Sequence, residues 1–117
     1  MQKNLNNYKS LLVKVEQHVA TVTLNRPEIR NAFNDEMIAE LTEVFTILGA
    51  DDNVRVVVLA AAGKAFCAGA DLNWMRAMAD YSYEENLGDA DKLAQMLKTI
   101  YKCPKPTVAA IQGDVYA

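Results

Sequence analysis

The sequence has 117 residues, which is enough for one small domain with a hydrophobic core. Its residues are 51% hydrophobic and 23% charged, and this balance excludes an intrinsically disordered chain. The net charge of −3 offers no basic face for nucleic acid, and no apolar run approaches the roughly 20 residues that span a bilayer. We therefore expect neither a nucleic-acid partner nor a membrane partner.

Residues 1–10 are polar and lack the apolar stretch of a signal peptide, so we expect a loosely ordered tail. Residues 11–117 are assigned to one domain, because no linker interrupts them. The two cysteines, Cys67 and Cys103, are too few for a disulfide framework and lack the spacing of metal ligands. Reduced thiols favour a cytoplasmic location.

Two β-rich runs, residues 11–16 and 19–24, flank Gln17 and His18 and predict a tight hairpin. The second strand ends before Pro27, which has no backbone N–H to donate to a sheet. Its alternate residues are expected to share one face: Ala20, Val22 and Leu24.

Asn34 is a favourable N-cap for a helix, and two acidic residues follow it. The apolar residues after it recur at helical spacing and predict one buried face: Met37, Ile38, Leu41, Val44, Phe45 and Leu48. Gly49 is placed to end this helix. Residues 54–61 then form an apolar run without alternation, which predicts a strand buried on both faces in a parallel sheet.

A loop rich in small residues, 63–71, joins this strand to an expected short helix at 72–78. Gly69 and its alanine neighbours leave the backbone accessible, so N–H groups there could bind an anion or a developing oxyanion. A small-residue loop is also an ordinary connection, and Asp71 is a good helix cap as well as a potential acid. Trp74 and Met75 could line a pocket or belong to the core.

Ser82 and Glu85 form the pattern of a capping box at the start of a longer helix. Its core face is predicted from spacings of three and four residues: Leu87, Ala90, Ala94, Leu97 and Tyr101. Pro104 ends the helix, and residues 107–111 predict a last short strand. The order of elements indicates an α/β fold.

Cys67 could serve as a nucleophile, but the only histidine, His18, lies in the expected hairpin turn. We interpret Cys67 as a packing residue and His18 as a turn residue.

Three stretches carry a more specific signal: residues 24–34, residues 65–72 (Ala-Phe-Cys-Ala-Gly-Ala-Asp-Leu) and residues 105–113 (Lys-Pro-Thr-Val-Ala-Ala-Ile-Gln-Gly). In this order they resemble the signatures of the enoyl-CoA hydratase/isomerase (crotonase) family. The resemblance implies a crotonase-like ββα spiral core, of which this chain would be the N-terminal part only. It implies an acyl-CoA thioester as substrate, no cofactor because coenzyme A is part of that substrate, and trimers or hexamers for full-length relatives.

The resemblance also assigns roles to residues. The backbone N–H of Ala70 corresponds to the first of two oxyanion-hole donors that stabilise the enolate. The positions expected to contact substrate or CoA are Arg30, Ala32, Ala68, Asp71 and Leu72. Asn73 stands where relatives carry a basic residue. The second oxyanion donor and the two glutamates of hydratases would follow residue 117, and Glu84, Glu85 and Asp114 do not occupy matching positions.

The predicted activity is therefore hydration of an α,β-unsaturated acyl-CoA, with the isolated chain inactive. The run from Gly69 to Met75, followed by residues 83–86, looks closest to the methylglutaconyl-CoA hydratase branch of leucine catabolism. The alternatives are another reaction of the superfamily, such as enoyl-CoA isomerisation, and a non-catalytic fragment or CoA-binding interaction module.

Overall fold

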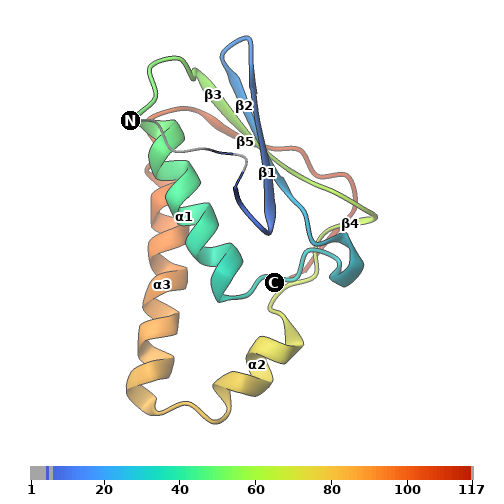
Figure 1. Cartoon of the computed structure of the whole chain (residues 1–117), viewed down its shortest axis with the longest axis vertical. Coiled ribbons are helices and arrows are strands. Elements are labelled where there is room, and N and C mark those ends of the chain that lie inside the picture. The colour runs from blue at the N-terminus through green and yellow to red at the C-terminus, as the bar shows by residue number, and fades with distance from the viewer. Residues whose placement is uncertain (1–4, 6, 117) are drawn as a thin grey trace.

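A four-stranded sheet and two long helices form most of the chain in the computed structural model, which describes residue 5 and residues 7–116 (Figure 1). The sheet has the order β1-β2-β3-β5, with β1 antiparallel to β2 and the other pairs parallel. Its strands are β1 (Leu11–Glu16), β2 (Val19–Leu24), β3 (Val56–Ala61) and β5 (Thr107–Ala109). The α/β class predicted from the sequence is confirmed. Most of the predicted tail, and Ala117, lie outside the described residues.

The β1–β2 hairpin turns at Gln17 and His18, which both adopt positive φ angles of 50° and 68°. His18 Nδ1 lies 2.9 Å from the carbonyl oxygen of Asn53, so the hairpin is attached to the loop before β3. The predicted hairpin and the role of His18 as a turn residue are both confirmed.

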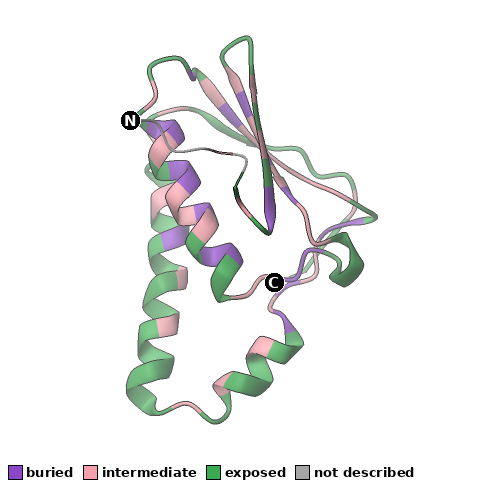
Figure 2. Ribbon diagram, viewed as in Figure 1, coloured by how far each residue is buried: buried purple, intermediate pink, exposed green. Residues whose placement is uncertain are grey.

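Helix α1 (Asp35–Gly49) packs against the sheet and supplies most of the core. Asn34 caps it by accepting a hydrogen bond from the N–H of Met37 at 3.0 Å. All six residues of the predicted apolar face are buried, as are Ala20, Val22 and Leu24 of β2 (Figure 2). A helix with a single apolar stripe has only one way to face a sheet, which is why this prediction is confirmed.

Gly49 has a different role from the one expected. The helix ends there, but the next residue, Ala50, stays right-handed, so no left-handed glycine cap forms. A Cβ on Gly49 would lie 3.0 Å from Cδ of Pro104. The glycine gives room for the close approach of the segment after α3.

The prediction that β3 is buried on both faces is wrong for the described chain. Val57 is completely buried, whereas the other five residues of the strand are only half-buried. The strand also begins at Val56 rather than Val54. Among the described residues, α1 covers one face of the sheet and no element covers the other to the same extent (Figure 2).

The predicted core face of α3 (Tyr83–Tyr101) is also wrong. Leu87 and Leu97 are each 57% exposed and Tyr101 is 88% exposed, and the two alanines between them are exposed as well. The helix instead turns Met96 inward, flanked by the half-buried Leu93 and Ile100. Helix α3 therefore has two apolar stripes, and α1 packs on the one that the spacing argument did not select. Its capping box is present as predicted.

Three short elements surround the loop of interest. A 3-10 turn, η1 (Pro27–Ile29), and a second sheet of β4 (Ala65–Cys67) and β6 (Asp114–Val115) were not predicted, because they are too short for a periodic signal. A Cβ on Gly113 would lie 2.0 Å from the carbonyl oxygen of Lys64, so only glycine fits where β6 approaches β4. Helix α2 (Leu72–Met78) has the predicted bounds.

Candidate functional site

The small-residue loop after β4 is held against the segment that follows η1 by backbone hydrogen bonds. The N–H of Ala68 donates to Arg30 O at 3.0 Å, and the N–H of Phe33 donates to Gly69 O at 2.8 Å. The N–H of Asp71 in turn donates to Phe33 O at 2.8 Å. Gly69 adopts a φ of 93°, which side-chain-bearing residues rarely adopt. The loop is therefore fixed on both sides of Ala70.

Ala70 is the exception in this network. The N–H groups of residues 68, 69 and 71 all have hydrogen-bond acceptors, whereas the N–H of Ala70 has none among the described residues. The residue is half-buried and lines two cavities. An N–H held rigidly with no internal partner is the form of donor that an oxyanion hole requires.

Asn31 connects this loop to β3 and β4. It is completely buried and has a left-handed φ of 57°, which Asn tolerates better than most residues. Its Oδ1 accepts from the N–H of Arg26 at 2.8 Å. Its Nδ2 donates to the carbonyl oxygens of Ala62 at 2.8 Å and Ala65 at 3.1 Å. Sequence reasoning missed this residue, although its position inside a motif and its residue type were a usable signal.

Asp71 is a structural carboxylate. Its Oδ1 caps α2 by accepting from the N–H groups of Asn73 and Trp74, and its Oδ2 lies 3.0 Å from an Nη of Arg26. Burial alone would raise the pKa of Asp71, but these backbone hydrogen bonds and the guanidinium together hold that pKa below its usual value. The same Arg26 side chain donates to Ala32 O at 2.9 Å. Arg26 is thus a second residue that the sequence did not single out.

Ala70 lines a cavity of about 430 Å³, called here the loop cavity. Five of the six predicted site residues line it: Ala32, Ala68, Ala70, Asp71 and Leu72. Arg76 of α2 also lines it and brings a cation three residues after Asn73. Arg76 was not among the residues singled out from the sequence.

Arg30, the sixth predicted residue, does not line the loop cavity. Its side chain is exposed, and it borders a neighbouring cavity of about 400 Å³ together with Lys64. Ala68 lines both cavities, so the three cations Arg76, Arg30 and Lys64 lie around the same loop.

A third cavity of about 390 Å³, called the helix cavity, lies between α2 and α3 and is also lined by Ala70. Its walls are mainly apolar and include Trp74 and Met75, which the sequence left open between pocket and core. The Trp74 ring meets Phe33 edge-on, with 6.1 Å between the ring centroids. On α3, Asp89 and Leu93 line the opposite wall.

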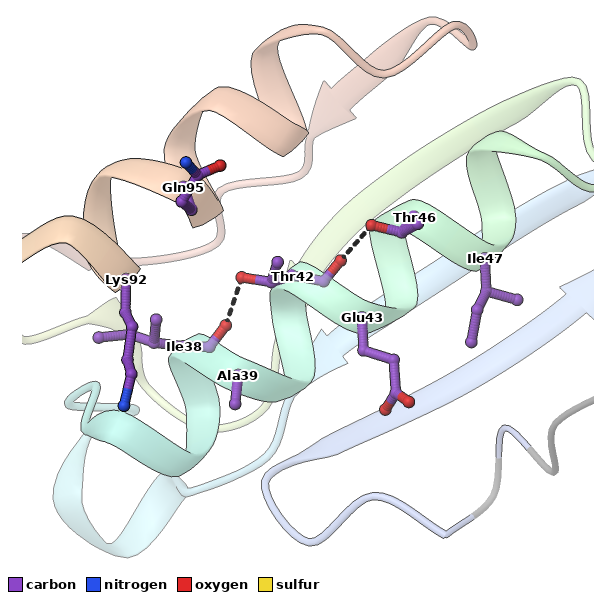
Figure 3. Close-up of a pocket in the computed structure, with 8 residues that line it drawn as sticks. All are labelled: Ile38, Ala39, Thr42, Glu43, Thr46, Ile47, Lys92 and Gln95. Carbon is purple, nitrogen blue, oxygen red and sulfur yellow. Dashed lines mark hydrogen bonds between the residues drawn. The ribbon is translucent and has the colours of Figure 1, made fainter. Parts of the chain in front are cut away.

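A larger cavity lies elsewhere, as a groove of about 490 Å³ between α1 and α3 (Figure 3). Its threonines are already bonded to helix carbonyls, with Thr42 donating to Ile38 and Thr46 to Thr42, each at 2.8 Å. Ala70 does not line this groove. Size alone therefore does not favour this groove over the smaller loop cavity, which Ala70 and the cation of Arg76 both line.

The described residues contain no cluster of three or more His, Cys, Asp or Glu that could hold a metal ion. Cys67 Sγ lies 3.4 Å from the carbonyl oxygen of Asn31 and 3.4 Å from the N–H of Gly69. These contacts fit a packing residue. His18 lies in the hairpin turn, where its Nδ1 contacts the carbonyl oxygen of Asn53. Within residue 5 and residues 7–116, no helix combines the length and apolarity needed to cross a membrane.

Residues 14–117 match the family model described as enoyl-CoA hydratase/isomerase. A 1,2-epoxyphenylacetyl-CoA isomerase of Escherichia coli is 40% identical over 111 residues, which cover 88% of this chain and 40% of that protein. An enoyl-CoA hydratase of Shewanella pealeana superimposes with a TM-score of 0.90 at 38% identity, covering 93% of this chain and 41% of that one. An enoyl-CoA hydratase of Mycobacterium smegmatis gives a TM-score of 0.80 at 42% identity, covering 88% and 40%. The chain spans about two fifths of the length of the curated relatives it matches.

Proposed function

Since this chain belongs to the enoyl-CoA hydratase/isomerase family, we propose that it binds an α,β-unsaturated acyl-CoA thioester as part of a hydratase-type enzyme. The thioester carbonyl oxygen would accept a hydrogen bond from the N–H of Ala70. The observation that carries this proposal is the Ala70 N–H, which is held in place, has no acceptor among the described residues and belongs to a residue that lines two cavities.

The proposed chemical role of Ala70 is to stabilise negative charge as it develops on the carbonyl oxygen. One such donor is typically worth about 10²–10³ in rate, or roughly 3–4 kcal/mol. Because the donor is a main-chain group, its position depends on the hydrogen bonds of Phe33 and Asp71 on either side. Asn31 and Arg26 would act as positioning residues, since both fix the segments that carry those bonds.

The CoA portion would occupy the loop cavity, with the acyl group in the helix cavity. Arg76 supplies a cation within the loop cavity, and Arg30 and Lys64 lie beside it. A guanidinium can form two parallel hydrogen bonds to a phosphate. We retain the predicted CoA contact of Arg30 and add Arg76 to it. The proposal needs no cofactor other than the CoA that the substrate carries.

The described residues do not supply a complete acid–base pair. Adding water requires one group to activate the water and another to protonate the α-carbon. Two carboxylates, Asp71 and Asp89, line the two cavities that contain Ala70. Asp71 already caps α2 and is hydrogen-bonded to Arg26. Asp89 alone cannot fill both roles at once. We therefore expect the 117-residue chain to bind acyl-CoA without hydrating it.

The finer sequence predictions remain proposals. Hydration is preferred over isomerisation, although one similar protein is named as an isomerase. A methylglutaconyl group, as in leucine catabolism, is the predicted acyl group, and a cytoplasmic location and assembly into trimers or hexamers are retained as predictions. The second candidate function is an acyl-CoA-binding module without turnover, which the exposed apolar stripe of α3 favours because such surfaces mark contact with other protein.

The proposal is tested by titrating the purified chain with crotonyl-CoA in a calorimeter while following the ultraviolet absorbance of the enoyl thioester. We expect binding without loss of the absorbance. Replacing Arg76 by Gln should weaken binding about tenfold, because a charge-assisted hydrogen bond is lost. Arg55→Gln is the matched control, since Arg55 is exposed and lines none of the three cavities around Ala70. Absence of any acyl-CoA binding would overturn the proposal, and turnover would overturn its acid–base argument.

A further inference from the structure

We propose that the helix cavity selects an uncharged, apolar acyl group and rejects an acyl group that ends in a carboxylate. This inference rests on the proposed function, because it takes the helix cavity as the acyl site. It is drawn from the way in which charged residues are divided among the three cavities around the loop of Ala70.

Cations line the loop cavity and its neighbour but not the helix cavity. Arg76 lines the loop cavity, and Arg30 and Lys64 line the neighbouring one. No lysine, arginine or histidine is among the described residues that line the helix cavity. The phosphates of CoA therefore have cations to pair with, whereas an anionic end group in the helix cavity has none.

The charge that the helix cavity does carry is negative. Among the described residues that line it, Asp89 is the one with an ionisable side chain. Asp89 is half-buried on α3 and forms no ion pair within the described chain. Its charge acts over several ångströms, so it repels an anion in the cavity whichever way its oxygen atoms point. Asn86 also lines the cavity, but a neutral amide does not balance the charge of a carboxylate.

The rest of the wall is mainly apolar and adaptable. It includes the edge-on rings of Phe33 and Trp74, the thioethers of Met75 and Met78, and Leu93. Thioether side chains adjust to ligands of different shape, and each methylene group that is fully buried tightens binding by about fourfold. A carboxylate that enters the same wall loses its water without gaining a partner.

This inference and the methylglutaconyl prediction exclude one another. A methylglutaconyl group ends in a carboxylate, which would enter a cavity that Asp89 lines and no described cation lines. The acyl class that fits the wall is an aliphatic or aromatic group without a charge.

The test compares CoA thioesters that differ only in their end group. The 117-residue chain is titrated in a calorimeter with pentanoyl- and glutaryl-CoA, hexanoyl- and adipoyl-CoA, and octanoyl- and suberoyl-CoA. The three lengths locate the point at which the end group lies inside the cavity. At that length we expect the methyl end group to bind at least about tenfold more tightly than the carboxylate.

Two variants assign this preference to the wall of the cavity. Met75→Lys brings a cation to an exposed position in the wall and should reduce the preference about tenfold. Leu87→Lys is its control, because it changes the net charge equally at an exposed position of α3 that does not line the cavity. Asp89→Asn removes the negative charge and should reduce the preference about threefold. Asp91→Asn is the matching control, since Asp91 is exposed on α3 and lines none of the three cavities.

The possible outcomes are distinct. Equal binding of the two end groups at every length overturns this inference and leaves the proposed function standing. An unchanged preference in folded Met75→Lys or in Asp89→Asn also overturns it, as does an equal reduction in either variant and its control. Circular dichroism shows whether Met75→Lys is folded, and Asp89→Asn decides alone if it is not. If no thioester binds, the proposed function fails and the inference fails with it.

Discussion

Asn31 is predicted to be the residue whose loss most disturbs the loop around Ala70. Its amide takes part in three hydrogen bonds, at 2.8, 2.8 and 3.1 Å, that join the η1 segment to the ends of β3 and β4. Each bond contributes a net 0.5–1.5 kcal/mol as an order-of-magnitude figure, so the three together contribute roughly 1.5–4.5 kcal/mol. The side chain is completely buried, so water cannot replace these bonds without rearrangement.

The backbone of Asn31 adds a separate contribution. At a φ of 57°, alanine would cost about 1 kcal/mol more than asparagine or glycine. We therefore expect Asn31→Ala to lower the free energy of unfolding by about 3–5 kcal/mol. Asn31→Gly should lower it by about 1 kcal/mol less, because glycine removes the same hydrogen bonds but tolerates the left-handed conformation.

Urea unfolding followed by circular dichroism measures both values. Asn53→Ala serves as the control, because Asn53 is exposed and its side chain makes no hydrogen bond within the described chain; its change should stay within about 0.5 kcal/mol. The reasoning is refuted if Asn31→Gly unfolds at the same urea concentration as the original protein. Equal values for the alanine and glycine variants would refute the backbone contribution alone.

Three further predictions concern stability. Asp71→Asn keeps a good helix cap but loses the charge, and should cost about 2 kcal/mol near neutral pH. The folded protein holds the pKa of Asp71 below its usual value, so the stability that the carboxylate contributes is fully present above an unfolded pKa of about 4 and is lost as the pH falls through the folded pKa. Acid should therefore destabilise Asp71→Asn less than it destabilises the original protein. Gly113→Ala should cost about 1–3 kcal/mol through a clash at 2.0 Å, whereas Gly88→Ala, with nothing within 4 Å in α3, should gain about 0.5–1 kcal/mol. Met96→Ala should cost about 2–4 kcal/mol, and Leu97→Ala less than about 1 kcal/mol.

Urea or thermal unfolding checks each of these values. An acid profile of Asp71→Asn parallel to that of the original protein would contradict the assignment of the low pKa. A tolerated Gly113→Ala would show that β6 does not approach β4 as described. A larger loss for Leu97→Ala than for Met96→Ala would mean that the spacing argument had identified the true core face of α3 in solution.

The contrast between α1 and α3 explains how far the sequence could predict the fold. In α1 the apolar residues form one stripe, so periodicity alone identifies the buried face. In α3 two stripes are apolar, and the choice between them depends on where α1 lies, which local spacing does not encode. The short strands β4 and β6 also could not be predicted from periodicity, because their pairing joins residues far apart in the chain.

The site divides in a similar way. The loop around Ala70 was predicted because its small residues form a contiguous motif, and the structure brings five of the six predicted residues to one cavity. Arg26 and Asn31 were missed because their roles depend on contacts with Asp71, Ala62 and Ala65, which lie 31 to 45 residues away. The motif marks Asn31 as a residue to consider, but the identity of these distant partners is seen only in the folded chain.

The most direct test of the account is the amide proton chemical shift of Ala70, measured by ¹⁵N–¹H NMR on the isotope-labelled chain during addition of hexanoyl-CoA. The account predicts a downfield shift of this amide, because its N–H gains a hydrogen bond to the thioester carbonyl. Free CoA has no such carbonyl and should leave the amide nearly unchanged. The account is contradicted if hexanoyl-CoA binds while the Ala70 amide stays in place and the shifts appear instead along the groove between α1 and α3.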